Sequence, residues 1–153
     1  MSKKNNKKTA IPANIKTNKE KVARSFLEED NEQQFKWAIR SDKIDCTHEV
    51  FGFNCEAQET FVYKIKPVLD SYTTMTWNQV IKRKSCHYID VSKLEKDFQD
   101  RIYELYNDNA PETLFQIQLT AKHRIFGLAD KGVFYILFND PNHLGYIVEK
   151  KNT

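Results

Sequence analysis

The side chains best suited to chemistry gather in one segment, residues 120–146, which has the pattern of an apolar β-hairpin. The turn sequence at 130–132 separates two apolar strands, and a polar group adjoins the far end of each strand. The two groups consist of Lys122, His123 and Arg124, and of Asp140, Asn142 and His143. Because residues equally distant from a hairpin turn face each other, we expect the groups to converge at the sheet end away from the turn.

Together, these residues have the properties that phosphodiester cleavage requires. Arg124 and Lys122 can neutralise a phosphate, whereas His143 and His123 can exchange protons near neutral pH, with Asp140 beside them. RNA supplies its own nucleophile, the 2′-hydroxyl, so we predict a catalytic site without a metal ion or other cofactor. The alternative is that Asp140 only bonds the backbone of its own turn and that His143 is a surface residue.

Other candidate sites have weaker support. Cys86-His87 suggests a metal site, but adjacent residues on a strand point to opposite faces, and no metal-binding spacing accompanies them. Catalysis by Cys46 or Cys55 with His48 lacks a supporting motif, and buried or inert thiols are the alternative. The four glycines of the chain form no phosphate-binding loop.

Length and composition indicate a single soluble domain. Ten Phe, seven Tyr and two Trp can fill one core in 153 residues. The longest strongly apolar run, residues 133–138, is far shorter than the roughly 20 residues of a membrane-spanning helix, and the N-terminal lysines precede no apolar signal segment. The odd number of cysteines suits a reducing compartment. We therefore expect a cytoplasmic protein without membrane association.

The N-terminal segment, residues 1–25, has the composition of a disordered basic arm. Its first 24 residues contain eight Lys and Arg residues and one glutamate, whereas the rest of the chain has a net charge of −4. Such an arm can bind a phosphate backbone, and its candidate RNA-binding residues are Lys3, Lys4, Lys7 and Lys8. The alternative is a tail that only aids solubility.

Periodicity predicts the elements of a single α+β domain at 26–153. Helices are expected at 57–72, with a break or kink at Pro67, at 77–84 after a capping box that begins at Thr76, and at 92–106 after a second box that begins at Ser92. Strands are expected at 35–41, 114–120, 123–128 and 133–138, and a loop at 42–55. This order predicts a small antiparallel sheet of about three to five strands with helices packed on one face.

The stretch from Met75 to His143 resembles a widespread group of small uncharacterised bacterial proteins. The resemblance rests on MTWN at 75–78, His-x-Ile at 87–89, a helix with Arg-Ile at 101–102, Arg-x-x-Gly at 124–127 and Asp-Pro-x-His at 140–143. The chain departs from that pattern at Phe138-Asn139, where the group has paired tryptophans, and in its basic arm.

The same C-terminal segment is distantly similar to RelE-like toxins of the YoeB type, which are ribosome-dependent messenger-RNA nucleases. His123-Arg124-Ile125-Phe126 matches a strand motif of that family, and His143 with Tyr146 loosely matches its C-terminal His-Tyr. The resemblance implies that Arg124 occupies the position of the catalytic arginine. The catalytic glutamate of that family has no secure counterpart in this chain, because Gln116 and Gln118 occupy the preceding strand.

From these observations we expect an RNA-directed protein that acts as a metal-independent endoribonuclease toxin. In this hypothesis Arg124 and Lys122 stabilise the phosphate, His143 is the general acid or base, and the arm raises affinity for RNA or the ribosome. A toxin of this kind implies a cognate antitoxin protein as a partner. One alternative is a non-catalytic module that binds a nucleic acid or a protein, and another is a small cytoplasmic fold without a functional site.

Overall fold

The computed structural model describes residues 32–147, so the predicted arm lies outside the described residues. The strands are β1 (Lys36–Ala38), β2 (Cys86–Asp90), β3 (Thr113–Gln118), β4 (Arg124–Asp130) and β5 (Val133–Asp140). The helices are α2 (Cys55–Thr60), α3 (Lys66–Tyr72), α4 (Trp77–Ile81) and α5 (Lys96–Tyr106), with a π-helical segment η2 (Phe61–Ile65) and the 3₁₀ turns η3 (Val91–Lys93) and η4 (Asn107–Asn109). The predicted α+β class is confirmed.

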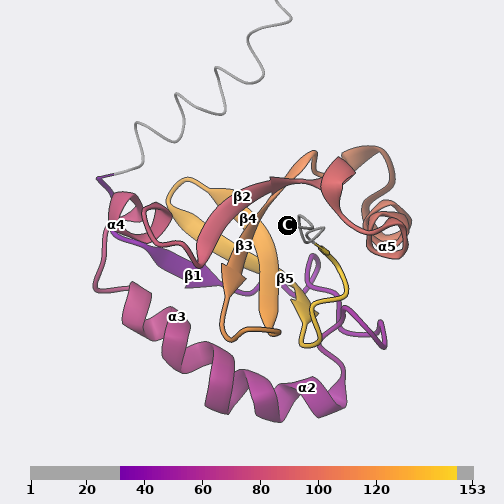
Figure 1. Ribbon diagram of the computed structural model, residues 1–153, viewed down its shortest axis with the longest axis horizontal. Coiled ribbons are helices and arrows are strands. Elements are labelled where there is room, and N and C mark those ends of the chain that lie inside the picture. Colours follow the sequence, from indigo (N-terminus) through magenta and orange to yellow (C-terminus); the bar gives the residue numbers. More distant parts are fainter. Residues whose placement is uncertain (1–31, 148–153) are drawn as a thin grey trace, which may run out of the picture.

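All five strands form one sheet in the order β1-β5-β4-β3-β2 (Figure 1). β2, β3, β4 and β5 are antiparallel neighbours, whereas β1 pairs with β5 in parallel. The sheet is therefore mixed rather than purely antiparallel. Periodicity predicts β1, β3, β4 and β5, but it does not predict β2.

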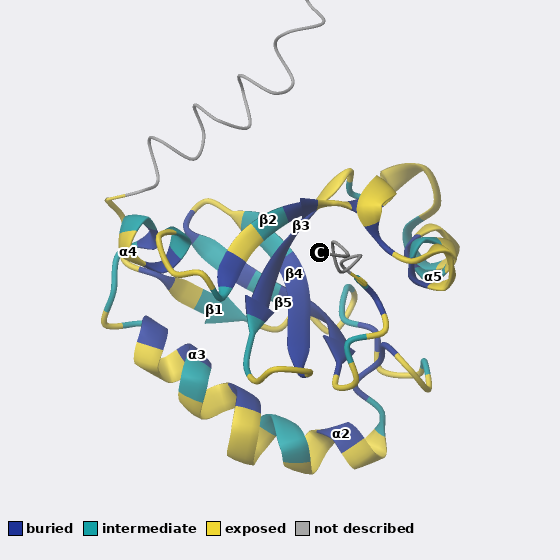
Figure 2. Cartoon of the chain, viewed as in Figure 1, coloured by how far each residue is buried: buried dark blue, intermediate teal, exposed yellow. Residues whose placement is uncertain are grey.

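The sheet carries a hydrophobic core on each face, so helices cover both faces rather than one. On the side that we call the α3 face, Ile65, Leu69 and Trp77 pack against strand residues such as Phe115 and Phe134. On the α5 face, Phe98 and Ile102 of α5 pack against Leu114, Phe126 and Phe138. The strands between them are largely buried, and the outer sides of the helices are exposed (Figure 2).

A β-bulge in the central hairpin decides which residues face α5. Gly127 pairs with Ile136 and Phe126 with Phe138, so that Leu137 is an extra residue of β5. Ile136 packs in the core of the α3 face, whereas Phe138 packs in that of the α5 face. Because the extra residue shifts the alternation of side chains, Asp140 also faces α5.

Local sequence signals explain two helices and fail at a third. The capping box at Thr76 is present, with Gln79 as its partner, and α4 follows it. The helix does not break at Pro67, because α2, the π-helical segment and α3 follow one another without a gap. Pro67 lies in the first turn of α3, directly after the π-helical segment. The predicted box at Ser92 is wrong, because residues 91–93 form a 3₁₀ turn and α5 begins only at Lys96.

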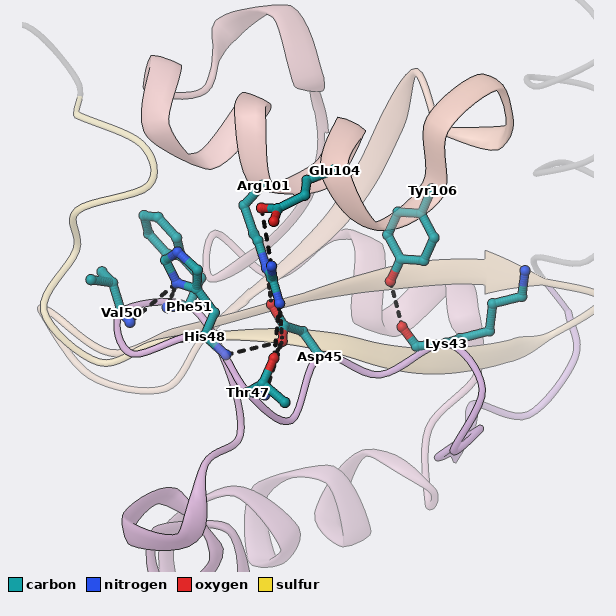
Figure 3. Close-up of polar contacts among 9 residues, drawn as sticks. All are labelled: Lys43, Asp45, Thr47, His48, Val50, Phe51, Arg101, Glu104 and Tyr106. Atoms are coloured by element: carbon teal, nitrogen blue, oxygen red, sulfur yellow. Dashed lines mark hydrogen bonds and ion pairs between the residues drawn. The ribbon is translucent and has the colours of Figure 1, made fainter.

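The loop between β1 and α2 is joined to α5 by a buried ion pair (Figure 3). Arg101 donates from Nε to Asp45 Oδ2 at 2.8 Å and from Nη2 to Asp45 Oδ1 at 3.0 Å. Burial of Asp45 acts to raise its pKa, but the bonds from Arg101 and from the backbone N–H groups of Thr47 and His48 outweigh burial and lower the pKa. The pair therefore fixes the loop that places Phe51 against Phe98.

Replacing Gly127 with alanine is expected to destabilise the protein. An added Cβ would lie 2.1 Å from the carbonyl oxygen of Tyr135 and 2.6 Å from the Phe134 ring, so the backbone of the bulge would have to move. Overpacking of this kind costs about 1 to 3 kcal/mol. Urea unfolding measures the loss, and an unchanged free energy of unfolding would show that the bulge tolerates a side chain.

Replacing Asp45 with asparagine is expected to lower the free energy of unfolding by about 3 kcal/mol at neutral pH, because Arg101 loses its buried partner. The folded-state pKa of Asp45 lies below its usual value of 3.8, so the carboxylate stabilises the protein above that pH and loses this effect as the pH falls through the folded-state pKa. Asp45→Asn should weaken the acid dependence that urea titrations measure below pH 3.8. Asp42→Asn, at an exposed position, is the control and should change neither quantity.

Candidate functional site

The two groups of predicted site residues lie at the same end of the sheet, away from the turn at Lys131 and Gly132. Arg124 pairs with Asp140 across β4 and β5. The turn residues have φ values of 50° and 80°, which fit a two-residue hairpin turn. The convergence expected from the hairpin pattern is therefore present in the backbone, but the side chains divide between the two faces.

His123 lies on the α3 face, apart from Arg124. Its Nε2 atom is 2.6 Å from Asn139 Oδ1, and both residues are buried. Burial lowers the pKa of His123, and the positive charge of Lys64 lowers it further, while Asn139 and Asp140 act in the opposite direction. The ring thus serves packing and hydrogen bonding between β4 and β5. Its neighbour Lys122 is exposed in the preceding loop.

Asp140 faces α5 and fixes the loop that follows β5. Its side chain is fully buried, with Oδ1 accepting the N–H of Leu144 at 2.9 Å and Oδ2 that of Gly145 at 2.8 Å. Both carboxylate oxygens accept hydrogen bonds from backbone N–H groups, as expected if Asp140 stabilises its own turn rather than taking part in catalysis. The carboxylate therefore positions His143, which has a φ of 55° and is half-buried.

Arg124 is a buried cation with spare hydrogen-bond donors. It is 8% exposed, and its Nη1 donates to the carbonyl of Ala121 at 2.9 Å. Within residues 32–147 it has no carboxylate at ion-pair distance and no other hydrogen bond. Burial lowers its pKa, and the more distant charge of Asp140 offsets part of that effect. A guanidinium carries five N–H donors, so most of these donors have no acceptor within residues 32–147.

The register of the sheet places His87, Gln116 and Gln118 on the same face as Arg124, since Gln118 pairs with Arg124 directly. His87 of β2 pairs with Gln116 of β3, and Gln116 pairs with Phe126 of β4. Partial burial of the His87 ring and the charge of Arg124 both lower the pKa of His87. The Nε2 atoms of Gln116 and His87 are 3.5 Å apart. We call His87, Gln116, Arg124 and the loop that Asp140 holds the Arg124 site.

Two buried polar atoms of this site have no hydrogen-bond partner in the described part of the chain. Among the described side chains, only Gln116 Oε1 and His143 Nε2 are buried without a hydrogen bond. Such atoms are costly in a folded protein unless a ligand or water pairs with them. Sequence reasoning considered His87 only as a metal ligand and Gln116 only as a residue in place of the catalytic glutamate of the RelE-like family. It missed their proximity to Arg124, because that proximity depends on the β2–β3 register.

The remaining candidates give no second catalytic cluster in the described part of the chain. No group of three or more His, Cys, Asp or Glu side chains in residues 32–147 is arranged to hold a metal ion. Cys46 and Cys55 are exposed free thiols, and Cys86 is a buried one whose pKa burial raises. The helices between residues 32 and 147 include none that is long and apolar enough to cross a membrane.

Comparison with known proteins places this site within a family. Residues 51–153 match the model of the family described as Uncharacterised protein UU032. The chain belongs to this family. The matched region contains β2 to β5 and all residues of the Arg124 site, which agrees with the resemblance to a group of uncharacterised proteins. Searches of curated proteins and of solved structures gave no match.

Replacing Arg124 with glutamine is expected to raise the pKa of His87 towards its usual value of 6.5. The positive charge of Arg124 disfavours the imidazolium form, and its removal leaves only the effect of burial. An NMR titration of the His87 ring measures the change, with Lys122→Gln as the control. An unchanged pKa in Arg124→Gln would show that the two side chains are not electrostatically coupled.

Proposed function

We propose that the protein is RNA-directed and is a metal-independent endoribonuclease similar to the RelE-like toxins, with the Arg124 site as its active site. The observation that carries this proposal is the state of Arg124, a buried guanidinium with one hydrogen bond and no ion pair within the described residues. A buried charge without an ion-pair partner at contact distance is unfavourable. A phosphate group would supply both such a partner and acceptors for the N–H groups that have none among the described residues.

The proton-transfer groups of the proposed reaction are His87 and His143. The lowered pKa of His87 keeps its ring neutral at physiological pH, so it can accept the proton of the ribose 2′-hydroxyl. That oxygen then bonds to phosphorus while the bond to the 5′ oxygen breaks, and His143 donates a proton to the leaving oxygen. The products are a 2′,3′-cyclic phosphate and a 5′-hydroxyl, with Arg124 stabilising the charge that develops on the phosphate.

The proposal also assigns a role to the basic arm and names the partners that this function would require. Lys3, Lys4, Lys7 and Lys8 lie outside the described residues, and we propose that they add salt-dependent affinity for RNA or the ribosome. Lys122, exposed beside Arg124, would contact a neighbouring part of the backbone. A toxin of this kind would be held inactive by a cognate antitoxin protein.

A second candidate is a module that binds RNA without cleaving it. The division of the predicted residues favours it, because His123 faces away from Arg124 and Asp140 uses both carboxylate oxygens on backbone N–H groups. These two residues are thus occupied by structural bonds. Binding through Arg124 would remain, with His87 and Gln116 as polar contacts to the ligand.

Expression in bacteria separates the two candidates. The wild type should arrest growth and fragment RNA, whereas Arg124→Gln should reduce cleavage at least about 100-fold because one transition-state donor group is lost. Arg40→Gln, which removes an exposed arginine, is the matched control and should behave like the wild type.

The contrary outcomes are equally distinct, given soluble protein in each culture. Healthy growth and intact RNA, together with RNA binding in vitro that requires Arg124, would support the binding module. Absence of RNA binding by the wild type would contradict both candidates. Cleavage by Arg124→Gln at the wild-type rate would show that the active site is not the Arg124 site.

A further inference from the structure

A second concave surface lies at the same end of the sheet, on its α3 side. It encloses about 620 Å³ between the C-terminal part of α3, the turn before β2 and the loop after β3. Its polar lining includes Arg83, Lys84, Ser71, Ser85, Thr120 and Gln118, and none of its lining residues is acidic. We call this surface the Arg83 pocket. Two cations and the hydroxyl groups of Ser85 and Thr120 make it suited to an anion, whereas the Ser71 hydroxyl already donates to the carbonyl of Val68.

The aromatic ring beneath Arg83 holds its guanidinium in place. Arg83 Cζ lies 5.2 Å from the centroid of the Tyr72 ring, and Tyr72 is itself buried against Phe35. This stacking occupies the face of the guanidinium and leaves its N–H edge able to donate. Neither Arg83 nor Lys84 forms an ion pair with a carboxylate within residues 32–147.

The Arg83 pocket is continuous with the Arg124 site through the backbone of one loop. Ala121 lines the pocket, and its carbonyl accepts the hydrogen bond from Arg124 Nη1. Gln118, another lining residue, pairs with Arg124 across β3 and β4 and donates its N–H to the carbonyl of Ser85. Positive charge therefore extends around the end of the sheet, from Arg83 and Lys84 to Arg124.

We propose that the Arg83 pocket is a second phosphate subsite, which binds the backbone of single-stranded RNA next to the phosphate held by Arg124. This inference rests on the proposed function and specifies its substrate. The two subsites lie on opposite faces of the sheet, so one ligand must bend around the sheet end to reach both. A duplex is stiff, as the persistence length of about 50 nm for double-stranded DNA illustrates, and resists such a bend, whereas a single strand follows it.

The test compares RNA binding at several salt concentrations. The probe is a fluorescent ten-nucleotide single strand with 2′-O-methyl groups, which blocks cleavage. For single strands the plot of log K against log salt concentration has a negative slope. The magnitude of this slope decreases by about 0.7 for each phosphate that the protein no longer neutralises. Arg83→Gln/Lys84→Gln should therefore reduce the slope by about 0.7 to 1.4 and weaken binding. The control, Lys93→Gln/Lys96→Gln, removes the same charge from the α5 side and should leave the slope near that of the wild type.

Each alternative result has a definite meaning. An equal reduction in both double variants, or a wild-type slope in Arg83→Gln/Lys84→Gln while Arg124→Gln binds weakly, overturns the second subsite and leaves the proposed function standing. Failure of the wild type to bind overturns both. Because Arg83 packs on Tyr72, thermal unfolding checks each variant, and Lys84→Gln alone provides the test if the double variant does not fold.

Discussion

The β-bulge between β4 and β5 is the constraint on which the polar end of this sheet depends. One extra residue, Leu137, transfers the side chains that follow it to the opposite face, so that Phe138 completes the core beneath α5 and Asp140 lies opposite Arg124. Gly127 permits the bulge because the carbonyl of Tyr135 occupies the space of a side chain. Without this shift, the loop after β5 would be held on the other face.

Two buried arginines show how the same side chain serves stability in one place and binding in another. Arg101 is matched by Asp45 through two hydrogen bonds, which raise its pKa and join the loop to α5. Arg124 is buried to a similar degree, has no ion pair among the described residues, and has a lowered pKa. A buried guanidinium that forms no ion pair with the described residues and lowers the pKa of His87 is therefore the feature of this chain that a proposed function has to explain.

Local signals predicted the elements better than they predicted the site. The Thr76 box and the turn at Lys131 were identified correctly because each depends on residues within one turn of chain. The Ser92 box failed because Leu94 is buried in the core and keeps an extended backbone, and the Gln99 side chain bonds its carbonyl instead. β2 was missed because its short sequence, CHYID, lacks a clear alternation of apolar and polar residues.

The sequence by itself determined the α+β class, the hairpin and the meeting of Arg124 with Asp140 at one end of it, because these follow from local periodicity and turn chemistry. Only the tertiary structure decided that His123 faces away and that His87 and Gln116 stand near Arg124. The physical reason is that the face of a strand residue depends on register and bulges, and that strand neighbours distant in sequence are selected by packing of the whole core.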